Sequence, residues 1–238
     1  MAVEFIPAAH VRATIAQVQQ ARVRAVERSG AVPQSPDARY WEFVFEANAA
    51  EVLSVLPAVT LAEGFTVRYR CFGERGNDIL VRPFVARATT DVERVRQLIE
   101  WHPPPDAQVT EQRGARTHDV DLLYRHLTFQ PNATGVFEYW LAMQELWASA
   151  RWTHSHVIAS AAELSQITAG EGWSVLHPVE SYEPAVVRSA DGARLAVLIQ
   201  SPLQRFEISL QQIDIGTDQS VTYADPILVA SGPRGYVL

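Results

Sequence analysis

Residues 132–151 read NATGVFEYWLAMQELWASAR, and this stretch decides the fold of the 238-residue chain. Wound at 3.6 residues per turn, its apolar side chains cover most of a helix surface. They are Val136, Phe137, Tyr139, Trp140, Leu141, Met143, Leu146 and Trp147. The small or polar positions form one narrow stripe: Glu138, Ala142, Glu145 and Ser149. A helix this apolar must be covered on several sides by the rest of the chain.

Flanking residues support this helix and enlarge the expected core. Asn132 or Thr134 can cap its start, and Arg151 complements the helix dipole at its end. Four tryptophans fall on or just after it: Trp140, Trp147, Trp152 and Trp173. Because tryptophan contributes a large apolar area when buried, we expect one aromatic core around this helix.

Composition narrows the class of protein. A hydrophobic content of 47% is ordinary for a soluble globular chain. No apolar run of about 18 residues occurs, and the N-terminus lacks a signal-peptide pattern. Cys71 is the only cysteine, which excludes an internal disulfide and a cysteine-rich zinc site. We therefore expect a soluble, cytoplasmic protein without a membrane partner.

All 20 basic residues are arginine, a bias typical of a GC-rich, bacterial-like genome. Without lysine, the chain lacks a P-loop lysine, a pyridoxal Schiff-base lysine and a kinase-type lysine. Residues 1–118 carry 14 Arg and 14 acids, net zero, whereas residues 119–238 carry 6 Arg and 13 acids, net −7. An acidic chain binds nucleic acid poorly, so we expect no nucleic-acid partner.

The N-terminal half alternates helices and strands. Residues 8–28 read as a helix with a narrow apolar stripe, which packs either on this chain or on a partner. Further elements are predicted at 40–46 (strand), 49–56 (helix), 65–72 and 78–87 (a pair of antiparallel strands) and 90–101 (helix). This order matches five-sixths of a ferredoxin-like unit. Residues 120–129 are either the missing strand or a helix.

The C-terminal half reads as a helix followed by a β-meander. A short helix is predicted at 161–168, and about six strands follow. Asp191-Gly192 predicts a hairpin turn joining strands at 184–189 and 194–200. Farther on, the apolar positions change phase between Leu210 and Ile213, which predicts a β-bulge at Gln211-Gln212.

These patterns predict an α+β fold with antiparallel sheets. We expect a ferredoxin-like N-terminal half and a C-terminal half made of a helix and a β-meander. The predicted units are an N-terminal amphipathic helix (residues 1–30), an α+β subdomain (39–102) and a helix plus antiparallel β subdomain (117–238). The polar, proline-rich residues 102–116 mark the boundary between the two larger units.

His154-Ser155-His156 is the most suggestive short motif for chemistry. In a strand, residues two apart share a face, so both imidazoles could hold one divalent transition metal. Further ligands could come from His118, Asp119, Asp121, His126 or His177. The alternative, which we favour, is that His154 and His156 only complement the C-terminal dipole of the preceding helix.

Arg68, Arg70 and Arg82 are predicted to share one face of the 65–87 hairpin. Guanidinium groups bind carboxylates and phosphates in a bidentate manner, so this face suits an anionic ligand or an acidic partner. The alternative is a solvated face whose arginines pair across the strands with acids such as Glu42. Cys71, on the opposite side of its strand, is expected to be a buried structural thiol.

Two function classes follow. The first is a non-enzymatic binding protein that acts through the N-terminal helix and the arginine face, needs no cofactor, and binds another protein or a second copy of itself. The second is a metal-dependent enzyme that uses His154 and His156. We favour the first class, because the missing lysine removes several enzyme classes and no motif points to another.

Overall fold

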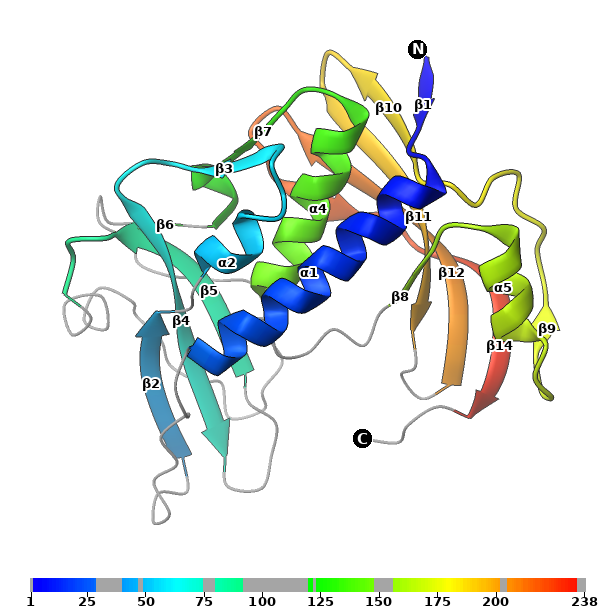
Figure 1. Cartoon of the computed structure of the whole chain (residues 1–238), viewed down its shortest axis with the longest axis horizontal. Coiled ribbons are helices and arrows are strands. Elements are labelled where there is room, and N and C mark those ends of the chain that lie inside the picture. Colours follow the sequence, from blue (N-terminus) through cyan, green and yellow to red (C-terminus); the bar gives the residue numbers. More distant parts are fainter. Residues whose placement is uncertain are drawn as a thin grey trace.

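A computed structural model describes residues 2–28, 40–46, 49–74, 80–91, 120–121, 123–147, 156–201 and 205–234 (Figure 1). It shows an α+β fold with mostly antiparallel sheets, as predicted. The described helices are α1 (Ala8–Arg28), α2 (Ala49–Leu53), α4 (Ala133–Trp147), α5 (Ala161–Thr168) and the 3-10 helix η1 (Leu123–His126). None of them is both long and apolar enough to cross a membrane.

The largest sheet has eight strands. Six follow the order β1-β10-β11-β12-β14-β9, while β8 pairs with β11 and β13 pairs with β12. Their bounds are β1 (Val3–Phe5), β8 (His156–Ile158), β9 (Ser174–Val175), β10 (Ala185–Ser189), β11 (Gly192–Ser201), β12 (Arg205–Gly216), β13 (Val221–Tyr223) and β14 (Ile227–Arg234). Helices α1 and α4 lie on one side of this sheet, and α5 lies beside β9 and β14 (Figure 1).

Two smaller sheets complete the fold. One has the order β2-β4-β5-β6, with bounds β2 (Tyr40–Glu46), β4 (Phe65–Glu74), β5 (Leu80–Arg87) and β6 (Val120–Asp121). The other pairs β3 (Val59–Leu61) with β7 (Leu127–Phe129). Residues 120–129 are therefore neither one strand nor one helix, because η1 separates β6 from β7.

Both predicted hairpins are confirmed. β4 pairs antiparallel with β5, and β10 pairs antiparallel with β11 around the turn before Gly192, whose φ is +136°. The ferredoxin-like detail is not confirmed: β2 pairs directly with β4, whereas a split β-α-β unit places another strand between its first two. The helix predicted at 90–101 and the boundary at 102–116 fall almost wholly outside the described residues, and the division into units stays a prediction.

Helix α4 forms the centre of the main core, as predicted. Phe137, Tyr139, Trp140 and Met143 are buried, and they pack with residues from α1, α2, β10, β11 and β12. Asn132 caps the helix, because its side-chain Oδ1 accepts a hydrogen bond at 2.8 Å from the N–H of Gly135. The polar stripe of α4 is buried as well, since Glu138, Ala142 and Glu145 are all covered.

Two details of the predicted core are wrong. Trp173 does not join Trp140: it packs in a second core with Phe206, at a ring distance of 6.5 Å. The phase change in β12 is not a bulge at Gln211-Gln212, because the register with β11 is continuous there. Instead the covered face changes: Ile208 belongs to the second core, whereas Ile213 belongs to the main one.

Helix α1 packs apolar side chains against the core of this chain. Val11, Val18 and Ala21 are buried, and Val11 and Val18 belong to the main core together with α4. Polar contacts hold its two ends: Arg24 donates to Glu51 of α2 at 3.0 Å, and Arg12 contacts Glu163 of α5 at 2.5 Å. α1 therefore crosses the molecule and contacts both α2 and α5 (Figure 1).

Candidate functional site

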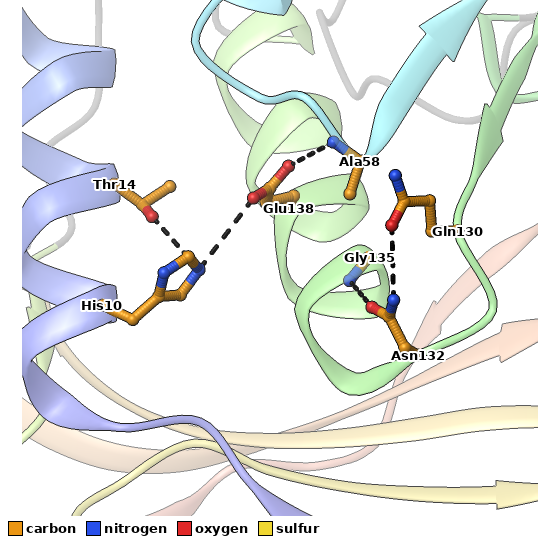
Figure 2. Close-up of polar contacts among 7 residues, drawn as sticks. All are labelled: His10, Thr14, Ala58, Gln130, Asn132, Gly135 and Glu138. Atoms are coloured by element: carbon orange, nitrogen blue, oxygen red, sulfur yellow. Dashed lines mark hydrogen bonds and ion pairs between the residues drawn. The ribbon is translucent and has the colours of Figure 1, made fainter.

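Glu138 of α4 carries a carboxylate that is buried in the main core. Its side chain is only 2% exposed. One oxygen, Oε2, accepts a hydrogen bond at 2.8 Å from the backbone N–H of Ala58, at the start of β3. The other oxygen, Oε1, lies 3.9 Å from Nε2 of His10 on α1 (Figure 2). Glu138 thus joins three segments that are far apart in the sequence.

The electrostatics of Glu138 follow from its burial. Loss of water around the carboxylate raises the pKa of Glu138 above its ordinary value, while the hydrogen bond from Ala58 and the nearby His10 lower it in part. The burial effect is the largest of the three. The folded protein therefore holds a proton at Glu138 more readily than an exposed glutamate would.

The imidazole of His10 lies between this buried carboxylate and solvent. Its side chain is 41% exposed, and its Nε2 lies 3.5 Å from the hydroxyl of Thr14, one turn along α1. A catalytic triad needs the acid on one imidazole nitrogen and the nucleophile on the other. Here both contacts fall on Nε2, so the geometry does not fit a triad.

Sequence reasoning did not identify His10 and Glu138 as a pair. The signal that the sequence offered was Glu138 itself, because an acid on an otherwise apolar helix is expected to become buried when that helix enters the core. Nothing in the local pattern indicates that His10, 128 positions earlier, lies beside it. That neighbour depends on how α1 crosses α4.

The predicted metal ligands are only partly described. His118, Asp119 and His154 lie outside the described residues. Asp121 is in β6, opposite Val85; the ring of His126 lies 4.2 Å from that of Phe65; and His177 is exposed beside β14. Within the described ranges, no three His, Cys, Asp or Glu side chains are grouped closely enough to hold a metal ion.

His156, the described member of the histidine pair, is exposed at the start of β8. It lines an open hollow of about 490 Å³ with Glu163, Gln166, Ile167 and Gln200. Glu163 is a possible carboxylate ligand, but Arg12 lies 2.5 Å from its Oε1 and the N–H of Ala159 donates to its Oε2. The guanidinium beside this carboxylate opposes cation binding there.

The three predicted arginines are described through their backbone positions. Arg70 of β4 is directly opposite Arg82 of β5, and Arg68 is opposite Glu46 of β2. Glu42, the acid named for the solvated alternative, is opposite Phe72 rather than an arginine. Cys71 lies between Phe43 and Val81 in the same register. The backbone register therefore pairs Arg70 with Arg82, and of the three arginines it sets only Arg68 directly opposite an acid.

Comparison of the chain with family models, with curated proteins and with solved structures found no match.

Proposed function

We propose that the chain is a non-enzymatic binding protein that recognises an acidic partner at Arg68, Arg70 and Arg82. The observation that supports this proposal is the register of β4 and β5, which sets Arg70 directly opposite Arg82. Directly opposite positions of an antiparallel pair lie on the same face of the sheet, about 4.5–5.5 Å apart between Cβ atoms. Arg68, two positions from Arg70, belongs to the same face.

Energetics favour a ligand at this position. Like charges that are directly opposite destabilise a strand pair, by roughly 0.2–1 kcal/mol on the scale of cross-strand pairs. A carboxylate bound between Arg70 and Arg82 would remove that repulsion and accept bidentate hydrogen bonds from a guanidinium. By register, Glu46 of β2 is directly opposite Arg68, and it is not directly opposite either of the other two arginines.

The partner that fits is an acidic protein segment. A second copy of the chain qualifies, because residues 119–238 carry a net charge of −7 whereas residues 1–118 are neutral. The N-terminal helix contributes less than the sequence suggested, since Val11 and Val18 of α1 pack in the main core of the chain. Its exposed polar side remains available to a partner.

A binding titration with a defined acidic probe tests the proposal. Fluorescently labelled poly-L-glutamate is titrated with the wild type and with R70Q/R82Q, and anisotropy is followed at two ionic strengths. The matched control is R188Q/R194Q, which removes the same charge from two exposed arginines paired with Glu4 and Asp214. Of the two double variants, we expect only R70Q/R82Q to bind poly-L-glutamate less tightly than the wild type. We also expect wild-type binding to weaken as the salt concentration rises. Equal loss in both double variants would reject a specific site.

A further inference from the structure

We propose that the open edge of strand β1 is a dimerisation surface, at which a second copy of the chain adds its own β1 in antiparallel orientation. β1 stands at one end of the largest sheet, and among the described strands it pairs only with β10. Figure 1 shows β1 at the periphery of the molecule, before the first turn of α1. This inference does not depend on the arginine site.

The backbone register directs two residues of β1 toward that open edge. The N–H of Ile6 donates to the carbonyl oxygen of Pro184 at 2.9 Å, so these two residues form a hydrogen-bonded pair. Such pairs alternate with non-hydrogen-bonded pairs along an antiparallel ladder, so Glu4 bonds to β10 whereas Val3 and Phe5 do not. The N–H and C=O groups of Val3 and Phe5 therefore point away from β10.

The same two residues carry exposed apolar side chains. Val3 is 51% exposed and Phe5 is 52% exposed. Their directly opposite neighbours on β10 are Val187 and Ala185, which share their face of the sheet and are partly covered. An edge that offers both backbone hydrogen-bonding groups and apolar side chains is suited to pairing with another strand.

A second β1 fits this edge because the strand complements itself. With Glu4 on a two-fold axis, Val3 of each copy lies opposite Phe5 of the other copy. Each of these pairs can exchange its outward N–H···O=C hydrogen bonds, so the outward groups of both strands are used. Directly opposite β-branched and aromatic side chains are also a favourable cross-strand combination. Pro7 has no N–H to donate, so the pairing ends before α1.

The charges on the other face of β1 are compatible with this pairing. The two-fold axis sets Glu4 opposite Glu4 of the second copy, and like charges at such positions destabilise a strand pair. Arg188 of β10 offsets this repulsion, because its Nε donates to Oε1 of Glu4 at 3.0 Å within each copy. Arg188 also donates to the carbonyl oxygen of Pro131, which holds it in place. The symmetric cluster of two glutamates and two arginines therefore has no net charge.

The opposite end of the sheet is less suited to the same pairing. β9 also ends the strand order, and its Val175 is 59% exposed. However, the N–H groups of Leu176 and His177 both donate to Val229 of β14, so Val175 is the one residue of β9 that the register directs outward. A single outward residue offers half of the backbone groups that β1 offers.

Oxidative cross-linking of an introduced thiol tests this dimer. E4C places a thiol on the two-fold axis, where opposite residues of a non-hydrogen-bonded pair have Cα atoms about 4.5 Å apart, within the range of disulfides. D191C is the matched control, because Asp191 is an exposed acid in the turn before β11. Both variants keep Cys71, and a peptide map identifies the disulfide between two introduced thiols. We expect E4C to form it at least about ten-fold faster than D191C, since association raises the effective concentration of the thiols.

Proline at Val3 then tests whether the contact is a strand pair. E4C/V3P lacks one outward N–H but keeps the N–H groups that β1 donates to β10, so each copy should still fold, which circular dichroism checks. E4C/V3T keeps the outward N–H and a β-branched side chain. We expect E4C/V3T to cross-link as fast as E4C, and E4C/V3P to slow to the D191C rate.

Two results would overturn the proposal. If E4C cross-links no faster than D191C, pairing of two copies is rejected, and a strand of a different protein becomes the favoured occupant of this edge. If folded E4C/V3P cross-links as fast as E4C/V3T, the two copies do not meet through the backbone of β1.

Discussion

The carboxylate of Glu138 accepts a hydrogen bond at 2.8 Å from the backbone N–H of Ala58, a residue 80 positions earlier. This contact fixes the start of β3 to the middle of α4. It also leaves one carboxylate oxygen for His10, so a single buried side chain connects α1, α4 and β3. A polar group in this position makes the stability of the core depend on pH.

The pH dependence of stability is the first prediction. Burial raises the pKa of Glu138 in the folded state, so folding takes up a proton there. The sign of the effect follows from these two pKa values. The stabilising contribution of Glu138 to the free energy of unfolding is fully present below its unfolded-state pKa of 4.5, and it is lost as the pH rises through its folded-state pKa. E138Q carries no such charge, so its stability relative to the wild type should rise between pH 5 and pH 8 in urea unfolding. Parallel pH profiles would contradict this prediction.

Truncation of Trp140 tests the central place of α4. Its side chain is buried in the main core, with its ring 5.9 Å from that of Phe137. Trp140→Ala should lower the free energy of unfolding by about 3–5 kcal/mol. Trp173→Ala is the comparison, because Trp173 is only partly buried and packs on the second core. We expect a smaller loss for Trp173→Ala in chemical denaturation; an unchanged melting temperature for Trp140→Ala would be inconsistent with a core role.

Gly135 is predicted to be required for the start of α4. A Cβ at this position would lie 2.0 Å from the carbonyl oxygen of Gln130, which is backbone and cannot move aside cheaply. Gly135→Ala should therefore destabilise the protein by about 1–3 kcal/mol, although alanine is the better helix former. Gly170→Ala provides the control, since its nearest atom would be 3.9 Å away, and its effect should stay within about 0.5 kcal/mol. Equal melting temperatures for both variants would refute the steric argument.

Local sequence patterns predicted the helices and strands, but they did not predict in every case which face of an element is covered by the rest of the fold. The apolar coverage of residues 132–151 identified the core helix, and the alternation on either side of Asp191-Gly192 identified the hairpin. Those signals are local, so the sequence carries them directly. The phase change in β12 was misinterpreted, because α5 covers one face of the sheet near Ile208 and α4 covers the other near Ile213. Which face is covered is a tertiary property.

The candidate sites show the same limit. The spacing of Arg68 and Arg70 predicts a shared face, but only the register of β4 with β5 sets Arg70 opposite Arg82. Likewise, the polar stripe on α4 marks Glu138 as unusual, whereas its partners His10 and Ala58 come from segments far away in the chain. Long-range pairing of this kind leaves no periodic signal in the sequence.

Charge reversal at Arg70 and Arg82 is the most direct test of the proposed binding function. R70E/R82E keeps two like charges at directly opposite positions of β4 and β5, so the repulsion across this strand pair is similar to that in the wild type. Labelled poly-L-glutamate and poly-L-arginine are titrated separately into the wild type and the variant at low ionic strength. The proposal predicts that the wild type binds the acidic polymer, and that the variant loses this binding and binds the basic polymer more tightly than the wild type does. Equal affinity of both proteins for poly-L-glutamate would contradict it.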